Sequence, residues 1–155
     1  AIRRAGRESR SPVIGGCAEL KVAVSDIRIA IRAQHTGKTR AFLEESLAPC
    51  DTLDLGALTD AALKSEEALC AYLRRTDYAD GVGPLQAGAS AFEKWCDDRQ
   101  TALVREVGRQ DYFTVAPLLG YVVARQNEIA AVRIILSGKL NGLPDERIRA
   151  RLREM

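Results

Sequence analysis

The chain is poor in aromatic residues, since Phe, Trp and Tyr together make up 5% of its 155 positions. Aromatic and β-branched side chains are the usual material of strands, whereas Ala, Leu, Arg and Glu, which are plentiful here, favour helices. No segment shows the pattern of a convincing strand. The sequence therefore predicts an all-α fold, and its length suits one domain or two small helical lobes.

Histidine is also scarce, and the cysteines are widely separated. The chain contains one histidine, His35, and four cysteines, which are Cys17, Cys50, Cys70 and Cys96. No two of them form a C-x-x-C pair, so a structural zinc site is not expected. We interpret the cysteines as free thiols in a reducing compartment and expect no metal or other cofactor.

Neither charge sign dominates, and no long apolar run is present. Lys and Arg number 23 against 21 acidic residues, so nucleic acid is not expected as a main partner. No apolar run approaches the roughly 18 residues that a membrane span needs, and no signal peptide is visible. Basic residues cluster near both ends, and we interpret these clusters as solvated surfaces.

One short motif invites a nucleotide-binding interpretation, which the residues around it contradict. Residues 36–39 read TGKT, but a phosphate-binding loop needs a glycine where Arg32 stands, and it follows a strand rather than a helix. Gly37 is better explained as a helix C-cap. A single histidine and carboxylates that are merely adjacent on helices supply no converging acid–base pair. We therefore predict no catalytic residues and no enzymatic activity.

Apolar spacing and breaker residues divide the chain into helices and connections. Helices are expected at 17–34, 39–48, 57–75, 84–107, 117–140 and from 144 onward. Residues 1–16 are expected to be a linker or the end of a preceding helix, 17–83 part of one helical repeat, and 84–155 a C-terminal repeat. The segment 117–140 has apolar residues on more than one face, which predicts a helix packed on several sides.

Two segments match when the chain is shifted by 105 residues. Residues 27–31 then lie over 132–136, Gly37 over Gly142, and Leu43 over Ile148. In both copies a long helix ends at a glycine and turns into a short amphipathic helix. The match predicts packed antiparallel helices built from pseudo-symmetric repeats. It also pairs Arg28 with Arg133, and since neither has a carboxylate three or four residues away, we expect both to be satisfied by groups outside their own helices.

The segment 117–144, which includes PLLGYVVARQNEI and VRIILSGKLNGLP, closely resembles the C-terminal signature of the V/A-type ATPase C subunit, which is called the d subunit in eukaryotic vacuolar enzymes. Residues 26–38 and 42–45 are similar to the equivalent helix and turn of the preceding repeat. The resemblance extends from about residue 11 to 155 and is most specific at the C-terminal end.

The resemblance implies a funnel-shaped protein of three helical repeats, peripheral on the cytoplasmic face of the membrane. Such a protein joins the central stalk to the proteolipid ring of a rotary ATPase, for proton or sodium ion transport, and performs no chemistry. Family chains are longer than this one, which corresponds to the last repeat and much of the one before it. The residues at 137–142 favour a prokaryotic source.

The ends of the repeated hairpins are the expected contact points with these partners. The candidate partner-binding residues are Lys38, Lys139, Asn141, Arg147 and Arg151. Two alternatives stay open: a helical-repeat adaptor of another multi-subunit assembly, and a small helical enzyme whose site the sequence does not reveal. Co-purification with stalk subunits or proteolipid distinguishes the first alternative, and an enzyme would require titratable groups that converge in a pocket.

Overall fold

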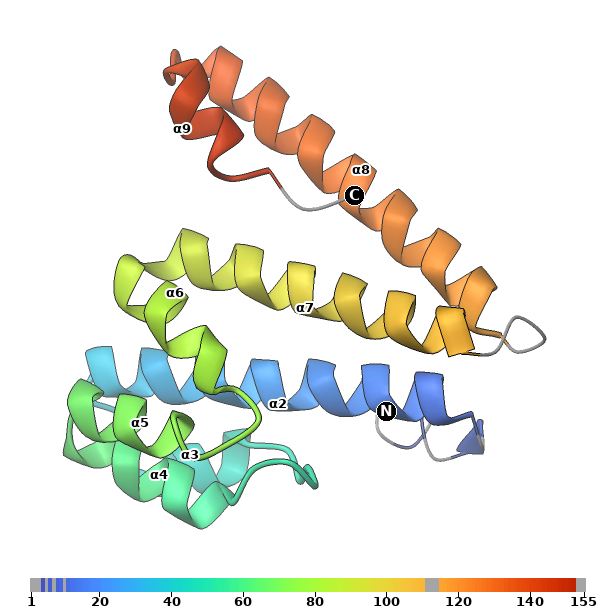
Figure 1. The fold of residues 1–155 in the computed structure, drawn as a ribbon. Coiled ribbons are helices and arrows are strands. Elements are labelled where there is room, and N and C mark those ends of the chain that lie inside the picture. Colours follow the sequence, from blue (N-terminus) through green and yellow to red (C-terminus); the bar gives the residue numbers. More distant parts are fainter. Residues whose placement is uncertain (1–3, 5, 7, 10, 111–114, 153–155) are drawn as a thin grey trace. The chain divides into compact units, whose positions relative to one another are not determined.

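The computed structural model describes residues 4, 6, 8, 9, 11–110 and 115–152 (Figure 1). Within these residues every regular element is a helix, so the all-α prediction is confirmed. The helices are α2 (Pro12–His35), α3 (Arg40–Ser46), α4 (Leu55–Lys64), α5 (Glu66–Leu73), the short 3₁₀ helix η1 (Ala79–Gly81), α6 (Val82–Ala87), α7 (Ala89–Gln110), α8 (Ala116–Leu140) and α9 (Asp145–Arg149). None of the described helices combines the length and the apolar character needed to cross a membrane.

The chain divides into two compact units, Ala1–Gly83 and Pro84–Met155. In the first unit, α2 packs against α3, α4 and α5, and α4 packs against α5. Its most buried large apolar side chains come from all four helices and are Ile27, Leu43, Leu58, Leu69 and Leu73. That each unit is a helical repeat stays a prediction.

Helix α2 is longer than its sequence predicts. It begins at Pro12 rather than at Cys17, so residues 12–16 are helical and not part of a linker. Proline is tolerated at the first helical position, where its missing N–H would have no intrahelical partner. Gly15 and Gly16 lower helix propensity, but buried Val13 and Cys17 on either side of them anchor this turn in the packed structure.

Two carboxylates of α2 hold the connection between α3 and α4. Asp26, 1% exposed, accepts a hydrogen bond from the Ala48 N–H at 3.0 Å. Glu19 accepts one from the Thr52 N–H at 2.8 Å, and the Thr52 hydroxyl lies 2.7 Å from the Tyr78 hydroxyl. Burial raises the pKa of Asp26 above its ordinary value, although hydrogen bonds from Ala48 and Cys50 oppose the shift. These contacts satisfy backbone groups of a segment that has no regular structure.

In the second unit, α7 and α8 form a helical hairpin, and α9 folds back on the C-terminal end of α8 (Figure 1). Buried Asn127 of α8 donates a hydrogen bond to the Thr101 hydroxyl of α7 at 2.9 Å. The single helix expected at 84–107 is instead two helices, because Gly88 adopts a φ of 117° between α6 and α7. A left-handed backbone at glycine ends a helix without the strain that a side chain would bring.

The prediction that 117–140 is packed on several sides is wrong for the described structure. Helix α8 buries Ala116, Val123, Asn127 and Gly138, while most of its large apolar side chains are exposed. Those exposed by 40% or more are Leu118, Tyr121, Val122, Ile129, Val132, Ile135, Leu136 and Leu140. Within the second unit, α8 therefore has an extensive exposed apolar surface.

Candidate partner-binding turns

The turn after α2 has the geometry that its glycine predicts. Gly37 has a φ of 61°, the Thr36 N–H bonds to the Arg32 carbonyl at 3.0 Å, and the Lys38 N–H bonds to the Ala33 carbonyl at 2.9 Å. This is a helix C-cap, in which a left-handed residue lets the chain satisfy the last carbonyls of the helix. The carbonyl oxygens at a helix C-terminus carry partial negative charge, so this end of α2 does not favour an anion.

The turn after α8 repeats this geometry 105 residues later. Gly142 has a φ of 65°, the Asn141 N–H bonds to the Ser137 carbonyl at 3.1 Å, and the Leu143 N–H bonds to the Gly138 carbonyl at 2.9 Å. The short helix that follows each turn has a single buried residue, Leu43 in α3 and Ile148 in α9. The two turns therefore share one local structure, as the alignment of Gly37 with Gly142 predicts.

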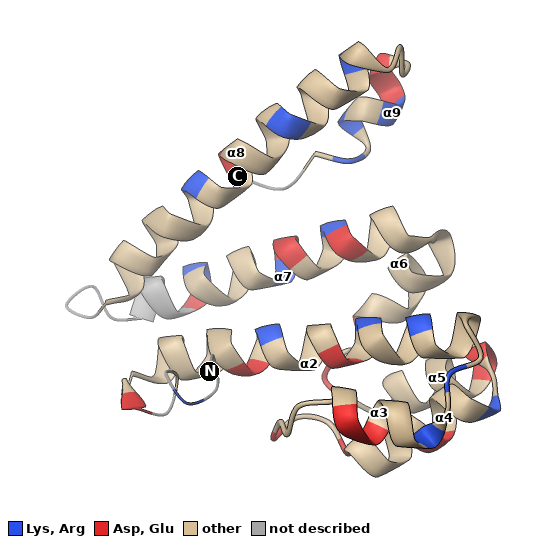
Figure 2. Cartoon of the chain, turned by 180° about the vertical axis from the view of Figure 1, so that it is seen from behind, with Lys and Arg blue, Asp and Glu red and all other residues tan. Residues whose placement is uncertain are grey.

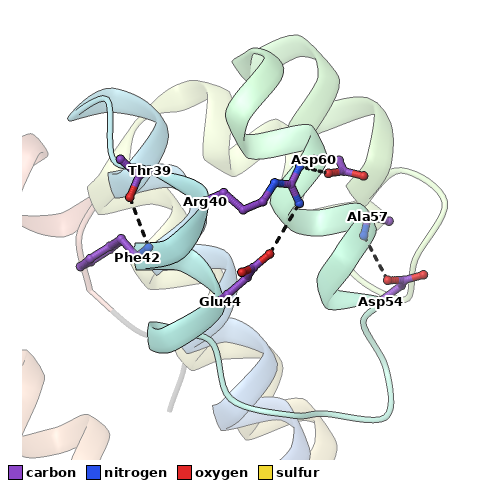
Figure 3. A network of polar contacts seen from close by, with 7 residues as sticks. All are labelled: Thr39, Arg40, Phe42, Glu44, Asp54, Ala57 and Asp60. Carbon is purple, nitrogen blue, oxygen red and sulfur yellow. Dashed lines mark hydrogen bonds and ion pairs between the residues drawn. The ribbon is translucent and has the colours of Figure 1, made fainter.

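In the first unit, exposed polar contacts hold the turn and α3 in place. The Lys38 ammonium lies 5.7 Å from the centre of the Phe42 ring, a cation–π distance. The Thr39 hydroxyl accepts a hydrogen bond from the Phe42 N–H at 3.4 Å, which caps α3 (Figure 3). Arg40 then pairs with Glu44 on its own helix and with Asp60 on α4. These contacts order the turn, and Lys38 is exposed on it.

In the second unit, two of the predicted partner-binding residues are engaged within their own turn. The Lys139 ammonium lies 2.5 Å from the Asp145 carboxylate, and this contact lowers the pKa of Asp145. The Asn141 side-chain amide donates to the Ser137 carbonyl at 2.7 Å. Arg147 is exposed on α9. Lys139 and Asn141 therefore stabilise the turn. A partner that binds either side chain must replace these contacts.

A cavity of about 220 Å³ lies between α8 and α9. Its lining consists of Arg133, Ile134, Ser137, Gly138, Leu143, Ile148 and Arg151. Gly138 lets the two helices approach closely, because a Cβ at this position would lie 2.6 Å from Ile148 Cγ1. Arg151, a predicted partner-binding residue, thus lines the same cavity as Arg133. Arg133 was not among the predicted partner-binding residues.

The repeat alignment pairs Arg133 with Arg28, but the two side chains lie in different surroundings. Arg28 is half-buried and its Nε has no hydrogen-bond partner, whereas Arg133 is exposed and lines the cavity. A shared role for the two arginines is therefore not supported. The repeat alignment did identify Arg133 as a cation with no carboxylate three or four residues away on its own helix. This was the one feature of the sequence that pointed to a residue of the cavity.

The predicted partner-binding residues fall in both units, since Lys38 belongs to the first and the other four to the second. No group of three or more His, Cys, Asp and Glu residues in the described ranges is arranged to hold a metal ion. Burial raises the pKa of the Cys17 and Cys70 thiols, so less of each thiol is in its reactive thiolate form.

A family model described as ATP synthase (C/AC39) subunit matches residues 2–151, nearly the whole chain. Comparison with curated proteins and with solved structures gave no significant match. The family match confirms the resemblance of 117–144 and of the earlier segments to the V/A-type ATPase C subunit.

Proposed function

Because the chain belongs to the ATP synthase (C/AC39) subunit family, we propose that it couples the central stalk of a rotary ATPase to the membrane proteolipid ring. In this role it transmits rotation for proton or sodium ion transport and catalyses no reaction itself. The observation that carries the proposal is the family match over residues 2–151. We place the protein at the cytoplasmic face of the membrane, held there by protein contacts, in a prokaryotic cell.

The long helix of the second unit supports a mechanical role. Helix α8 has 25 residues, so at a rise of 1.5 Å per residue it extends over about 38 Å. A linker between two turning parts must be stiff, because a soft one would dissipate torque in local bending. A continuous helix resists bending since each turn is hydrogen-bonded to the next.

The exposed apolar surface of α8 supports membership of an assembly. Leu118, Ile129, Val132, Leu136 and Leu140 are each more than 50% exposed. Large exposed apolar patches mark sites of interaction with other proteins, membranes or ligands. It favours a component of a larger complex over a self-contained enzyme.

The polar turns supply the contacts that we assign to the stalk and the ring. Lys38 of the first turn, and Lys139, Asn141, Arg147 and Arg151 of the second, are exposed. Rims of protein interfaces are polar, and polar contacts suit an attachment that forms and separates.

Reconstitution of the protein with its partners tests the proposal. The full-length protein is mixed with central-stalk subunits and, separately, with detergent-solubilised proteolipid ring, and each mixture is separated by size. We expect the protein to elute with both partners. Elution apart from both would replace the coupling role with that of an adaptor for another assembly.

A further inference from the structure

The cavity between α8 and α9 combines an apolar wall with two arginines. Ile134, Leu143 and Ile148 form the wall, while Arg133 and Arg151 contribute guanidinium groups. A cavity of roughly 150 Å³ holds a benzene molecule. At about 220 Å³, this one has room for an aliphatic side chain together with a carboxylate.

The surroundings of the cavity are positively charged. Residues 133–151 contain five cations, Arg133, Lys139, Arg147, Arg149 and Arg151, against two carboxylates, Asp145 and Glu146. One of these carboxylates, Asp145, already pairs with Lys139. Figure 2 shows basic residues on α9 and on the adjoining part of α8. Arg133 forms no ion pair with any residue that the structure describes, so its charge is available to a ligand.

We propose that this cavity binds a carboxylate carried beside an aliphatic side chain on a partner polypeptide. Arg133 and Arg151 bind the carboxylate, since the guanidinium fork matches its two oxygens. Ile134, Leu143 and Ile148 cover the aliphatic group. The proposal rests on the proposed role of the second turn and α9 as a contact surface, and it names the chemistry of the partner at that surface.

The hydroxyl of Ser137 adds a third polar group to the cavity. Its oxygen lies 3.5 Å from the Asn141 amide nitrogen, which can donate to it. The Ser137 O–H can then donate in turn to a carboxylate oxygen, because a hydroxyl both accepts and donates. A free phosphate or a lipid headgroup could occupy the basic side of the cavity, but it would leave the apolar wall uncovered. The lining therefore favours a ligand with both characters.

Titration with two matched small probes tests the proposal. N-acetyl-leucine carries the carboxylate and the aliphatic side chain, and N-acetyl-leucinamide differs only in lacking the charge. Binding to the full chain is followed by amide chemical shifts in NMR spectra. The variants Arg133→Gln and Arg151→Gln each remove a cation from the cavity. Arg149→Gln removes the same charge from an arginine of α9 that is outside the lining, and serves as the control.

We expect N-acetyl-leucine to shift Gly138, Leu143 and Ile148 saturably, and the neutral probe to bind more weakly. Arg133→Gln and Arg151→Gln should each weaken binding by up to about fivefold, as for an exposed ion pair, while Arg149→Gln leaves it unchanged. Equal binding of both probes would overturn the carboxylate assignment. Inorganic phosphate that binds as tightly as N-acetyl-leucine would overturn the polypeptide assignment. So would binding to phosphatidylglycerol vesicles that depends on the two arginines, if N-acetyl-leucine does not bind. Absence of saturable shifts would reject the site.

No ATPase partner takes part in this titration. Its failure would therefore leave the coupling role untouched, and failure of the protein to assemble with stalk and ring would leave the result of the titration standing.

Discussion

The close approach of α8 and α9 at Gly138 predicts a measurable penalty for the smallest possible side chain. In Gly138→Ala, the new Cβ would lie 2.6 Å from Cγ1 and 2.8 Å from Cδ1 of Ile148, so Ile148 or α9 must move. Overpacking of this kind costs about 1–3 kcal/mol. Alanine also favours the helix over glycine by about 1 kcal/mol. The net expectation is a loss of about 0–2 kcal/mol in the free energy of unfolding.

Gly120 of the same helix supplies the matched control. A Cβ at Gly120 would lie 3.5 Å from Val104 Cγ1, an ordinary van der Waals distance. Gly120→Ala should therefore show the helix-propensity gain without the clash, and stabilise by up to about 1 kcal/mol. Urea unfolding measures both variants, and the difference between them, about 1–3 kcal/mol, isolates the packing penalty.

A double-mutant cycle identifies the residue responsible. Ile148→Ala should cost about 2–5 kcal/mol by itself, because Ile148 is 5% exposed. In that background the clash is absent, so adding Gly138→Ala should be neutral or stabilising, which corresponds to a coupling energy of about 1–3 kcal/mol. Additive effects of the two substitutions, to within about 0.5 kcal/mol, would refute the packing of α9 on α8.

Three further predictions follow from particular contacts. Asp26→Asn should flatten the pH dependence of stability, because burial raises the pKa of Asp26 above its ordinary value of 3.8. The contribution of Asp26 to stability is full below pH 3.8 and is lost as the pH rises through its folded-state pKa. Unfolding midpoints in urea between about pH 4 and 7 check this prediction. Ser65→Ala should cost about 1 kcal/mol of unfolding free energy, because the Ser65 hydroxyl accepts a hydrogen bond from the Ala68 N–H at 3.1 Å at the start of α5. A thermal melt that matches the wild type would contradict this. Charge reversal at Lys139 together with Arg147 should weaken assembly with the stalk and ring while the helix content in the circular dichroism spectrum is retained, because both side chains are exposed and the lost Lys139–Asp145 pair is a surface ion pair that contributes little to stability. Full retention of assembly by this double variant would exclude the second turn as a contact.

Local signals in the sequence predicted several helix ends, although the single helix expected at 57–75 is divided at Ser65 into α4 and α5. Gly37 and Gly142 both adopt positive φ where the expected helices end, and the segment expected at 117–140 is α8. These features depend on residues within one helical turn of each other, so the sequence alone contains the necessary information. The same holds for the local equivalence of the two turns.

Features that depend on distant residues were predicted less well. Pro12 and the two glycines after it resemble a break, yet packing around Val13 extends α2 through them. Apolar residues on several faces of α8 indicate burial only if other protein covers them, and periodicity does not identify that protein. The cavity brings Arg133 and Arg151 together through the fold of α9, which no spacing on a single helix encodes.

Coupling in the reconstituted holoenzyme tests the central claim most directly. ATP hydrolysis and ion pumping are measured side by side in proteoliposomes that contain the enzyme with this protein and without it. If the protein links stalk to ring, hydrolysis should continue without it while pumping falls, and adding the full-length protein back should restore pumping. Pumping that stays tightly coupled to hydrolysis in the complete absence of the protein would contradict the coupling role.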